Sequence, residues 1–267
     1  MAEQQHPPVA VVTRIGSWIG TETAATFLKR GVTVIGIATH QSRIDRVQET
    51  LSGIAPEEGA VPGKFIPCAG SLLDKQVLDQ IMEHLDYETT AGGGRLVALV
   101  NNAGAYEDSG EAAGTHFEQW DKLQHSLIEP LKLFHRIRHL MRRFRARAIN
   151  VASDDTHAHL PRQISLVAIK TAVNMLTAEL ALLEPYVTSL AVHPNLPSTA
   201  SARGESATGA SAGGSQRQGP ASNGSSAPDT EHLLPAGELI VDLALNADRS
   251  MSGKFFVYNE PDLSQLV

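Results

Sequence analysis

Hydrophobic and polar positions follow two patterns along the chain. Short runs rich in valine, isoleucine and alanine predict strands covered on both faces. These runs lie at residues 9–12, 32–38, 65–68, 96–100, 148–151, 187–192 and 253–258. Longer amphipathic or strongly apolar segments predict helices. They lie at residues 22–30, 41–51, 74–85, 117–143, 166–183 and 236–245. We predict a surface loop at residues 87–94, because three consecutive glycines end that segment.

Residues 198–230 break the pattern. This segment consists almost entirely of glycine, serine, alanine and proline, with few apolar anchors, so no core can be built from it. We predict a disordered, enlarged loop there, and a mobile lid over a ligand site is the alternative. Strand and helix alternate along the rest of the chain, and its 267 residues suit a single α/β domain spanning 1–267.

Composition narrows the classes of partner. The net charge of −7 offers no general attraction for nucleic acid or an anionic membrane. No apolar run approaches the length of a membrane span, and the first residues show no secretory signal. Cys68 is the only cysteine, which excludes an internal disulfide. We therefore expect a cytoplasmic protein without nucleic-acid or membrane partners.

Three stretches carry candidate chemistry. The first predicted strand runs into Thr13-Arg14-Ile15-Gly16-Ser17-Trp18-Ile19-Gly20, and strand, glycine-bearing turn and helix are typical of the start of a dinucleotide-binding unit. Asn101-Asn102-Ala103-Gly104 follows a buried strand directly. Ser153 follows strand 148–151, and Lys170 lies in the next helix. Together these stretches resemble the short-chain dehydrogenase/reductase (SDR) family, and the second of them matches the family pattern residue for residue.

The resemblance implies an α/β fold with a doubly wound, Rossmann-type parallel sheet and helices on both faces. It also implies NADP or NAD as cofactor and a homo-oligomer formed through helices 117–143 and 166–183. Carried over to this chain, the family's cofactor contacts fall on Thr13, Arg14, Gly16, Ile19, Gly20, Asn102, Ala103, Gly104, Lys170, Pro194 and Thr199. Its catalytic positions that remain polar are Ser153 and Lys170. We predict that the asparagines after strand 96–100 brace the sheet through hydrogen bonds to backbone groups.

The turn that would hold the cofactor departs from the family. Arg14 and Trp18 stand where the family has its first two glycines, and only Gly20 remains in place. An indole at the second position should fill the space through which the pyrophosphate approaches the helix. A side chain at the first position resists any positive φ the turn requires. The alternative is that Arg14 pairs with a phosphate or carboxylate while Trp18 stacks on a flat ligand.

The catalytic positions depart as well. Leu166 occupies the place of the family's tyrosine and Leu127 that of its asparagine, and leucine neither donates nor accepts a proton. Asp154, in the loop after Ser153, is a candidate replacement acid, since partial burial raises a carboxyl pKa. The acids and histidines at 154–159 have a spacing that permits a metal, but we predict none. The end of strand 32–38 offers neither an acid for the ribose nor an arginine for a 2′-phosphate at residues 38 and 39.

Three functional hypotheses follow from these departures. The first is an SDR-like protein of small-molecule metabolism with lost or altered redox activity. It keeps a pocket for a small molecule and performs a non-redox rearrangement or cyclisation in a biosynthetic pathway. The second is an active NADP(H)-dependent oxidoreductase that reduces a carbonyl or imine with an atypical proton donor. The third is a non-catalytic subunit that pairs with an intact SDR through the two long helices.

Overall fold

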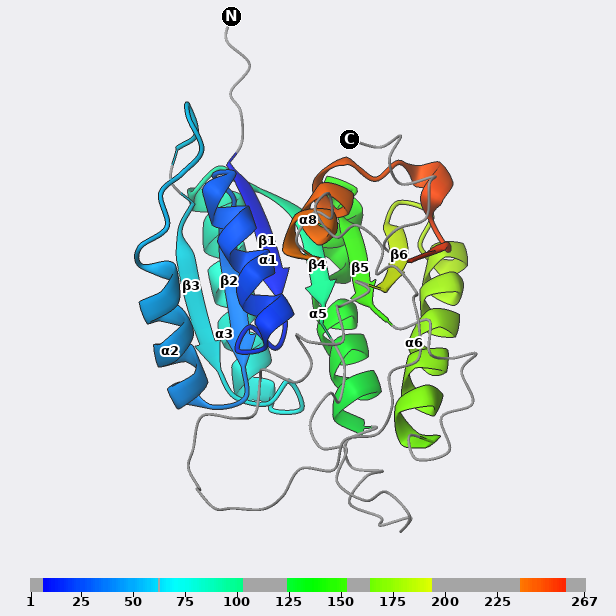
Figure 1. Ribbon diagram of the computed structural model, residues 1–267. Coiled ribbons are helices and arrows are strands. Elements are labelled where there is room, and N and C mark those ends of the chain that lie inside the picture. Colours follow the sequence, from blue (N-terminus) through cyan, green and yellow to red (C-terminus); the bar gives the residue numbers. More distant parts are fainter. Residues whose placement is uncertain (1–6, 62, 103–123, 153–163, 194–235, 258–267) are drawn as a thin grey trace, which may run out of the picture.

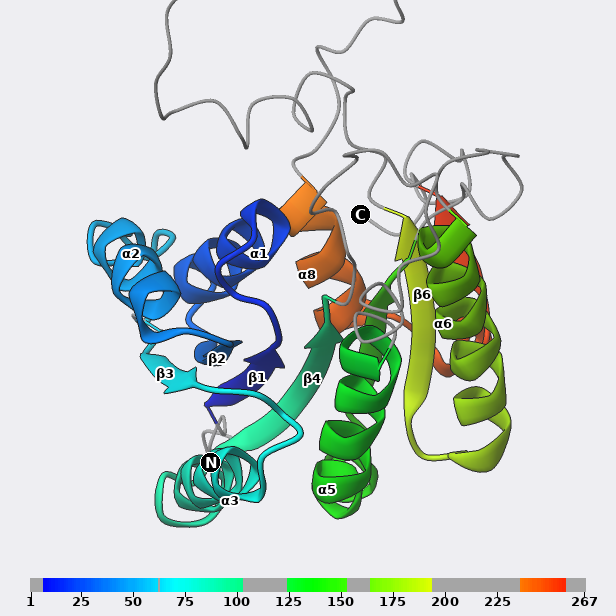
Figure 2. The same cartoon turned by 90° about the horizontal axis from the view of Figure 1, so that it is seen from below.

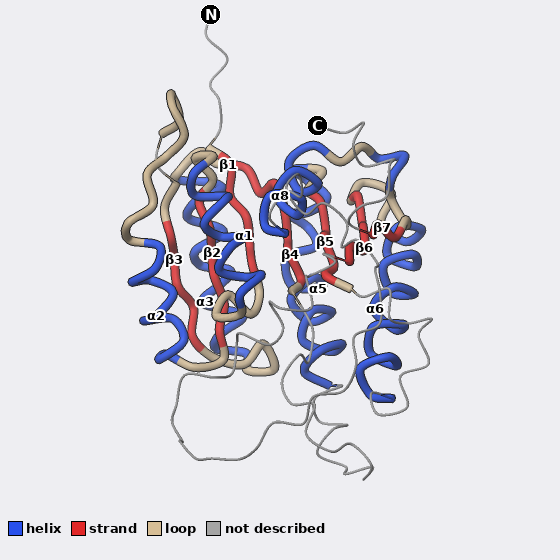
Figure 3. The backbone as a smooth tube through the Cα atoms, viewed as in Figure 1, coloured by secondary structure: helices blue, strands red, loops and turns tan. Residues whose placement is uncertain are grey.

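The computed structural model describes residues 7–61, 63–102, 124–152, 164–193 and 236–257. Within these residues a seven-stranded sheet has the order β3-β2-β1-β4-β5-β6-β7, and every neighbouring pair is parallel. The strands are β1 Pro8–Val12, β2 Thr33–Ala38, β3 Phe65–Ala69, β4 Arg95–Asn101, β5 Arg147–Val151, β6 Thr188–His193 and β7 Phe255–Val257. The predicted strands are thus all present (Figure 3).

The strand order reverses direction between β1 and β4. The chain moves outward from β1 through β2 to β3, returns to pair β4 with β1, and then proceeds to β7. In such sheets, ligands bind outside the carboxyl ends of the strands at the point of reversal. Thr13, after β1, and Asn102, after β4, lie at this point. The topology therefore brings two of the sequence motifs to one edge of the sheet.

Helices cover both faces of the sheet (Figures 1 and 2). They are α1 Trp18–Lys29, α2 Gln41–Leu51, α3 Lys75–Asp86, α5 Glu129–Phe144, α6 Ile164–Leu183 and α8 Ala236–Asn246. Residues of α1, α2 and α8 share one buried cluster with the sheet, whereas α3, α5 and Leu180 of α6 share the other. The doubly wound α/β fold expected from the sequence is confirmed.

Two helical segments differ from the sequence prediction. The predicted loop at 87–94 instead begins with the π-helical turn η1, Tyr87–Ala91, which extends α3. Within it the Thr89 hydroxyl donates to the Leu85 carbonyl (2.7 Å), Gly92 caps its end, and the next residue, Gly93, has a φ of +64°. Helix α1 begins at Trp18, four residues before the predicted start, because Ser17 caps it.

The long predicted helix at 117–143 is described only from residue 124. It opens with the π-helical turn η2, Gln124–Ile128, and continues as α5. Arg145, with a φ of +51°, ends α5 in the left-handed conformation common at helix C-termini. The low-complexity segment 198–230 lies outside the described residues, so the prediction of disorder there stays a prediction.

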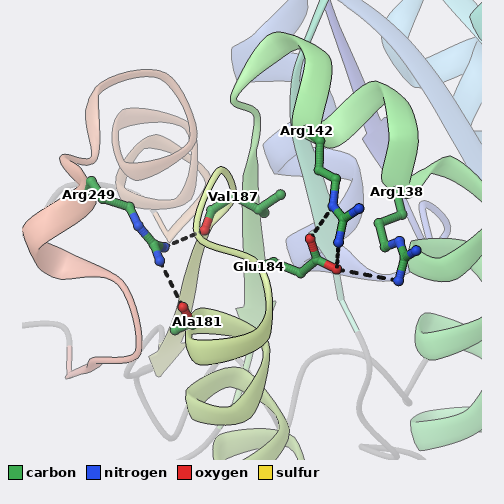
Figure 4. Close-up of polar contacts among 6 residues, drawn as sticks. All are labelled: Arg138, Arg142, Ala181, Glu184, Val187 and Arg249. Carbon is green, nitrogen blue, oxygen red and sulfur yellow. Dashed lines mark hydrogen bonds and ion pairs between the residues drawn. The ribbon is translucent and has the colours of Figure 1, made fainter.

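The carboxyl end of α6 is held by charged side chains on two sides (Figure 4). Glu184, which is buried, accepts two hydrogen bonds from Arg142 of α5 (Nε 2.6 Å, Nη2 3.0 Å), and Arg138 lies 3.6 Å away. On the other side, Arg249 of the short helix η4, Arg249–Met251, donates to the carbonyls of Ala181 (2.8 Å) and Val187. Cations complement the carbonyl dipoles at a helix end. These contacts fix α6, and therefore Lys170, relative to the sheet.

Candidate functional site

The first βα turn is closed by hydrogen bonds of its own side chains. Ser17 caps α1, because its hydroxyl accepts from the Gly20 amide (3.1 Å). Thr21 donates from its hydroxyl to the Ile15 carbonyl (2.8 Å). A Cβ at Gly20 would lie 2.5 Å from the Arg14 carbonyl oxygen, so only glycine fits. The retained glycine therefore has a packing role in the turn itself.

Asn102 ties the end of β4 to this turn. Its backbone amide donates to the Thr13 hydroxyl (3.0 Å), and its side-chain amide donates to the Ser17 hydroxyl (2.6 Å) and the Arg14 carbonyl (3.5 Å). The expected bonds to backbone groups are therefore only part of the bracing. The shorter bond goes to a side chain, because α1 starts early enough to place Ser17 there. Thr13 and Asn102 lie together as predicted, although both side chains serve the turn.

Arg14 and Trp18 take the two glycine positions without unfolding the turn. Arg14 has a φ of +49°, so the first position still requires the left-handed conformation that a glycine would adopt freely. Trp18 is the first residue of α1, and 54% of its surface is exposed. The turn thus forms with an arginine under strain and an indole at the helix amino terminus.

Arg43 was missed by the sequence analysis. It lies in the first turn of α2, and its aliphatic stem packs on Gly16, where an added Cβ would lie 3.1 Å from Arg43 Cβ and Cδ. This arrangement brings a guanidinium-bearing side chain to the end of β2, where neither Ala38 nor Thr39 offers charge. Ile19, in contrast, points its side chain into the hydrophobic core, so only its backbone faces the turn.

Helix α8 packs closely on α1 beside this turn. A Cβ at Gly237 would lie 2.7 Å from Glu22 Cγ and 2.9 Å from the Thr23 amide nitrogen. Glu22 accepts a hydrogen bond from the Gly237 amide at the start of α8. Burial, together with the neighbouring charge of Glu238, raises the pKa of Glu22, although the bond from Gly237 opposes this shift. Glu22, an acid with a raised pKa, therefore lies beside the first βα turn.

Lys170, the retained catalytic lysine, is buried at the carboxyl end of β5. Only 1% of its surface is exposed, and its ammonium group donates to the Val151 carbonyl (3.1 Å). A buried lysine needs such acceptors to offset the loss of hydration. Helix α6 thereby holds the lysine against the strand that leads to Ser153.

An apolar cluster lies beside Lys170 on α6. Leu127, at the position of the family's asparagine, lies in η2 and packs against a cluster formed by Ala152, Ile169, Val173 and Ala191. A second group of polar residues lies deeper in the sheet. Asn101 donates to the Asn150 side-chain oxygen (2.8 Å), and Asn150 donates to the Thr177 hydroxyl (2.9 Å). This chain of bonds links β4, β5 and α6, so the polar groups that remain here support the fold.

Several predicted site residues lie outside the described residues, and their predicted roles stay predictions. They are Ala103, Gly104, Ser153, Asp154, Pro194 and Thr199. In the part of the chain that is described, no group of three or more histidine, cysteine or acidic side chains is placed to hold a metal. Burial raises the pKa of the Cys68 thiol to about 11, which keeps it protonated at neutral pH.

A sequence signal existed for one of the two missed residues. Ser17 stands three residues before Gly20 and directly before an apolar helical segment, which is the position of an N-cap. It was overlooked because the helix was predicted to start at Glu22. Arg43 had no such signal, since its contact with Gly16 joins two different βα units.

Comparisons of the sequence agree with the fold. The family model described as short chain dehydrogenase matches residues 8–208. A short-chain type dehydrogenase/reductase from Picea abies is 27% identical over 177 residues, which cover 65% of this chain and 64% of that relative. The chain thus matches slightly less than two thirds of the length of that relative. No described helix is both long enough and apolar enough to span a bilayer.

Solved structures with the same fold cover almost the whole chain. A short-chain dehydrogenase/reductase from Saccharomyces cerevisiae superposes with a TM-score of 0.72 at 18% identity, covering 97% of this chain and 99% of that one. The RhlG/NADP active-site complex from Pseudomonas aeruginosa superposes with a TM-score of 0.68 at 19% identity, covering 97% of both chains. At these identities the likeness shows the fold alone.

Proposed function

Because this chain belongs to the short-chain dehydrogenase/reductase family, we propose that it acts in small-molecule metabolism with its standard redox chemistry lost or altered. The observation that carries the proposal is the state of Lys170. It is buried and bonded to the Val151 carbonyl, while the family's two other proton-handling positions nearby are leucines. Leu166, at the position of the family's tyrosine, has no hydroxyl group whose pKa Lys170 could lower.

Proton supply is the first function that the site lacks. Leu127 packs against an apolar cluster that includes Ile169 and Val173. Both residues lie on α6, the helix that also carries Lys170. Leu166, in the first turn of α6, carries no proton to donate. General acid catalysis contributes about 100-fold to 10,000-fold to a rate. A carbonyl reduction at this site would therefore need a donor such as Asp154, whose predicted role stays part of the proposal.

Cofactor access is the second function that this proposal treats as lost. In the family's usual pose the pyrophosphate approaches the start of α1 across a glycine, whereas this chain places Trp18 there. The bonds of Asn102 stabilise the loop, and the proposal is that the indole of Trp18 blocks this pose. NADP or NAD therefore has no step in the proposed chemistry.

The activity that remains is positioning of a small organic molecule beside Lys170. Holding a flexible substrate in one reactive geometry accelerates rearrangement or cyclisation without any redox partner. Lys170, Ser153 and Asp154 are the polar groups proposed to orient such a substrate. An apolar surround such as the Leu127 cluster favours a ligand that is mostly hydrocarbon.

A turnover assay tests this proposal. NADPH and NADH consumption would be followed with a panel of ketones, aldehydes and imines, with the wild type beside the Lys170→Met variant. We expect no turnover above background with either protein. Reduction of any substrate by the wild type that is lost in Lys170→Met would contradict the proposal.

A second candidate is an active NADP(H)-dependent reductase, and the position of Arg43 favours it. Arg43 packs on Gly16 at the end of β2, a place where arginine accommodates a 2′-phosphate and where no acid selects NAD. The structural neighbour with NADP in its active site has the same fold. If this candidate is correct, Arg43→Ala weakens the binding of NADPH more than the binding of NADH. Arg46→Ala, which removes an exposed arginine one turn further along α2, leaves both affinities unchanged.

The cytoplasmic location, the homo-oligomer and the role as a partner subunit of an intact SDR stay predictions. Each is tested by a measurement on the native protein: fractionation of the source cells, sedimentation of the purified chain, and co-purification with a defined SDR. None of them changes the proposed chemistry at Lys170.

A further inference from the structure

His193 places a buried imidazole at the carboxyl edge of the sheet. It is the last residue of β6, and only 7% of its surface is exposed. Ligands of doubly wound sheets bind outside the carboxyl ends of the strands, and histidine is the side chain that most often transfers protons in catalysis. Neither the family resemblance nor the chemistry proposed above gives this imidazole a role. Its place in the fold therefore adds a proton carrier to the edge that holds Lys170.

The imidazole lies on the face of the sheet that α6 covers. Successive strand residues point to opposite faces. Val192 belongs to the buried cluster that α1 and α8 share with the sheet, whereas Ala191 packs in the cluster with Val173 of α6. His193 follows Val192, so its side chain lies on the same face as that of Ala191. Helix α6, which carries Lys170, packs beside β6 (Figure 2).

Lys170 reaches the same edge from α6. Its ammonium group donates to the Val151 carbonyl (3.1 Å), and Val151 is in register with Val192, the residue before His193. Adjacent strands lie about 4.8 Å apart. The ammonium is therefore bonded to the end of one strand, and the imidazole ends the next one. Both groups thus lie at one edge of the sheet, on its α6 face.

Small apolar side chains accompany these two groups. Ala152 and Ala191 belong to the cluster beside Lys170, and the Ala152 amide donates to the Val192 carbonyl (2.7 Å), which holds the two strand ends together. Methyl groups exchange no proton and keep the local dielectric constant low, so a charge interacts more strongly there than in water. An imidazole and an ammonium in such surroundings suit a carbonyl substrate, since one group moves a proton and the other stabilises a negatively charged oxygen.

We propose that His193 is the acid–base residue of this site and acts on a carbonyl compound whose oxygen lies against the ammonium group of Lys170. This assignment rests on the proposed function and names its substrate class. The substrate is a mostly hydrocarbon ketone with a hydrogen on the carbon next to the carbonyl. The apolar cluster against which Leu127 packs would receive the hydrocarbon part.

The step is a proton transfer that leaves the oxidation state of the substrate unchanged. The imidazole of His193 takes a proton from the carbon next to the carbonyl, and the electron pair of that carbon–hydrogen bond forms the carbon–carbon double bond of an enolate. The carbonyl π electrons move to the oxygen, where the Lys170 ammonium stabilises the charge. The imidazolium then returns a proton to a carbon of the same molecule. Atoms and charge balance without an oxidant, a reductant or a nicotinamide, as a non-redox rearrangement requires.

Hydrogen exchange with the solvent tests this step directly. The full chain, without any nicotinamide, would be incubated in heavy water with cyclohexanone or 2-tetralone, and proton NMR would follow the loss of the hydrogens next to the carbonyl. The variants are His193→Gln, His193→Ala and Lys170→Met. His135→Gln, at an exposed histidine of α5, is the matched control. Urea denaturation of each variant would show whether it folds.

We expect exchange above the buffer rate with the wild type. His193→Gln should lower the rate at least about 100-fold, a contribution typical of general acid–base catalysis, and His135→Gln should leave it unchanged. Free imidazole should restore exchange in His193→Ala but not in Lys170→Met, a result that a purely structural role of His193 does not produce.

Three outcomes would overturn the assignment. They are no exchange by the wild type with either ketone, equal exchange by the wild type and a folded His193→Gln, and a loss in His193→Ala that free imidazole does not restore. The wild-type measurement decides even where a variant fails to fold. Failure of the proposed function is a distinct result, because it would show as NADPH consumption in the turnover assay and not as a loss of exchange.

Discussion

The first βα turn and the β5–α6 site have diverged in different ways. In the turn two glycines of the family pattern have changed while a closed turn still forms: Arg14 holds a left-handed conformation, and Asn102 bonds to Ser17. At β5–α6 the lysine is retained and donates to the Val151 carbonyl, while leucines stand at the positions of the family's asparagine and tyrosine. Hydrogen bonds that support the fold are present in both regions, whereas the family's tyrosine, its asparagine and two of its cofactor-loop glycines are absent from the sequence.

This difference separates the family residues that stabilise the fold from those that take part in the chemistry. Thr13, Asn102 and Gly20 each make a contact that the turn needs in the absence of any ligand. Leu127, Leu166 and Trp18 stand where function alone constrained the residue. A match to the first group therefore predicts architecture and is silent on catalysis. The variants below change the two regions together or one at a time.

Repairing both regions together should have the largest effect. The variant with Arg14→Gly, Trp18→Gly, Leu127→Asn and Leu166→Tyr restores the cofactor approach and the proton supply, and we expect carbonyl reduction with NADPH at least about 100-fold above the wild type. Repair of the turn alone, or of the two leucines alone, should give no gain. Full activity from the leucine repair alone would show that the turn already admits the cofactor.

Removing the bridge between the end of β4 and the first βα turn should cost stability. In Asn102→Ala the Ser17 hydroxyl and the Arg14 carbonyl lose a donor inside a part-buried turn, which costs about 2 kcal/mol of unfolding free energy. Chemical denaturation with urea measures this change in the free energy of unfolding. Asn246→Ala, at an exposed position, is the matched control and should stay within about 0.5 kcal/mol. An unchanged midpoint for Asn102→Ala would mean that the turn does not depend on this bridge.

Relieving the strain in the turn should raise stability slightly. A non-glycine residue in the left-handed conformation costs about 1–2 kcal/mol, and glycine loses about 0.5–1 kcal/mol of that gain through chain entropy. Arg145→Gly, beyond α5, should therefore raise the free energy of unfolding by up to about 1 kcal/mol. Arg14→Gly relieves a similar φ, but Arg14 also has a further contact, so the gain should be smaller. A larger gain in Arg14→Gly than in Arg145→Gly would contradict this expectation.

The smallest effect concerns pH and the α1–α8 contact. The raised pKa of Glu22 means that the folded state binds its proton more tightly than the unfolded state, whose value is near 4.5. The free energy of unfolding therefore falls as pH rises from that value to the raised pKa of the folded state. Glu22→Gln should remove this loss at neutral pH, by less than about 1 kcal/mol because water screens a half-buried group. Glu238→Gln should remove a smaller part, and denaturation midpoints from pH 4 to pH 8 measure both.

Most of the fold could be predicted from the sequence because it rests on local patterns. Buried strands such as Leu96–Val100 and amphipathic helices such as Gln41–Leu51 show their periodicity within one element. The candidate site was predictable only where a family motif follows a strand. The contact of Arg43 with Gly16 and the bond of Lys170 to Val151 join separate elements, so no spacing along the chain indicates them. The early start of α1 was missed because the prediction placed the first helical residue at Glu22, although Ser17 stands at an N-cap position.

The measurement that tests the central claim most directly is a calorimetric titration of NADPH into the wild type and into Trp18→Gly. If an indole at the start of α1 has closed the approach to the pyrophosphate, the wild type binds no more tightly than about 1 mM. Trp18→Gly should then bind measurably more tightly. A micromolar dissociation constant for the wild type, unchanged in Trp18→Gly, would contradict the account.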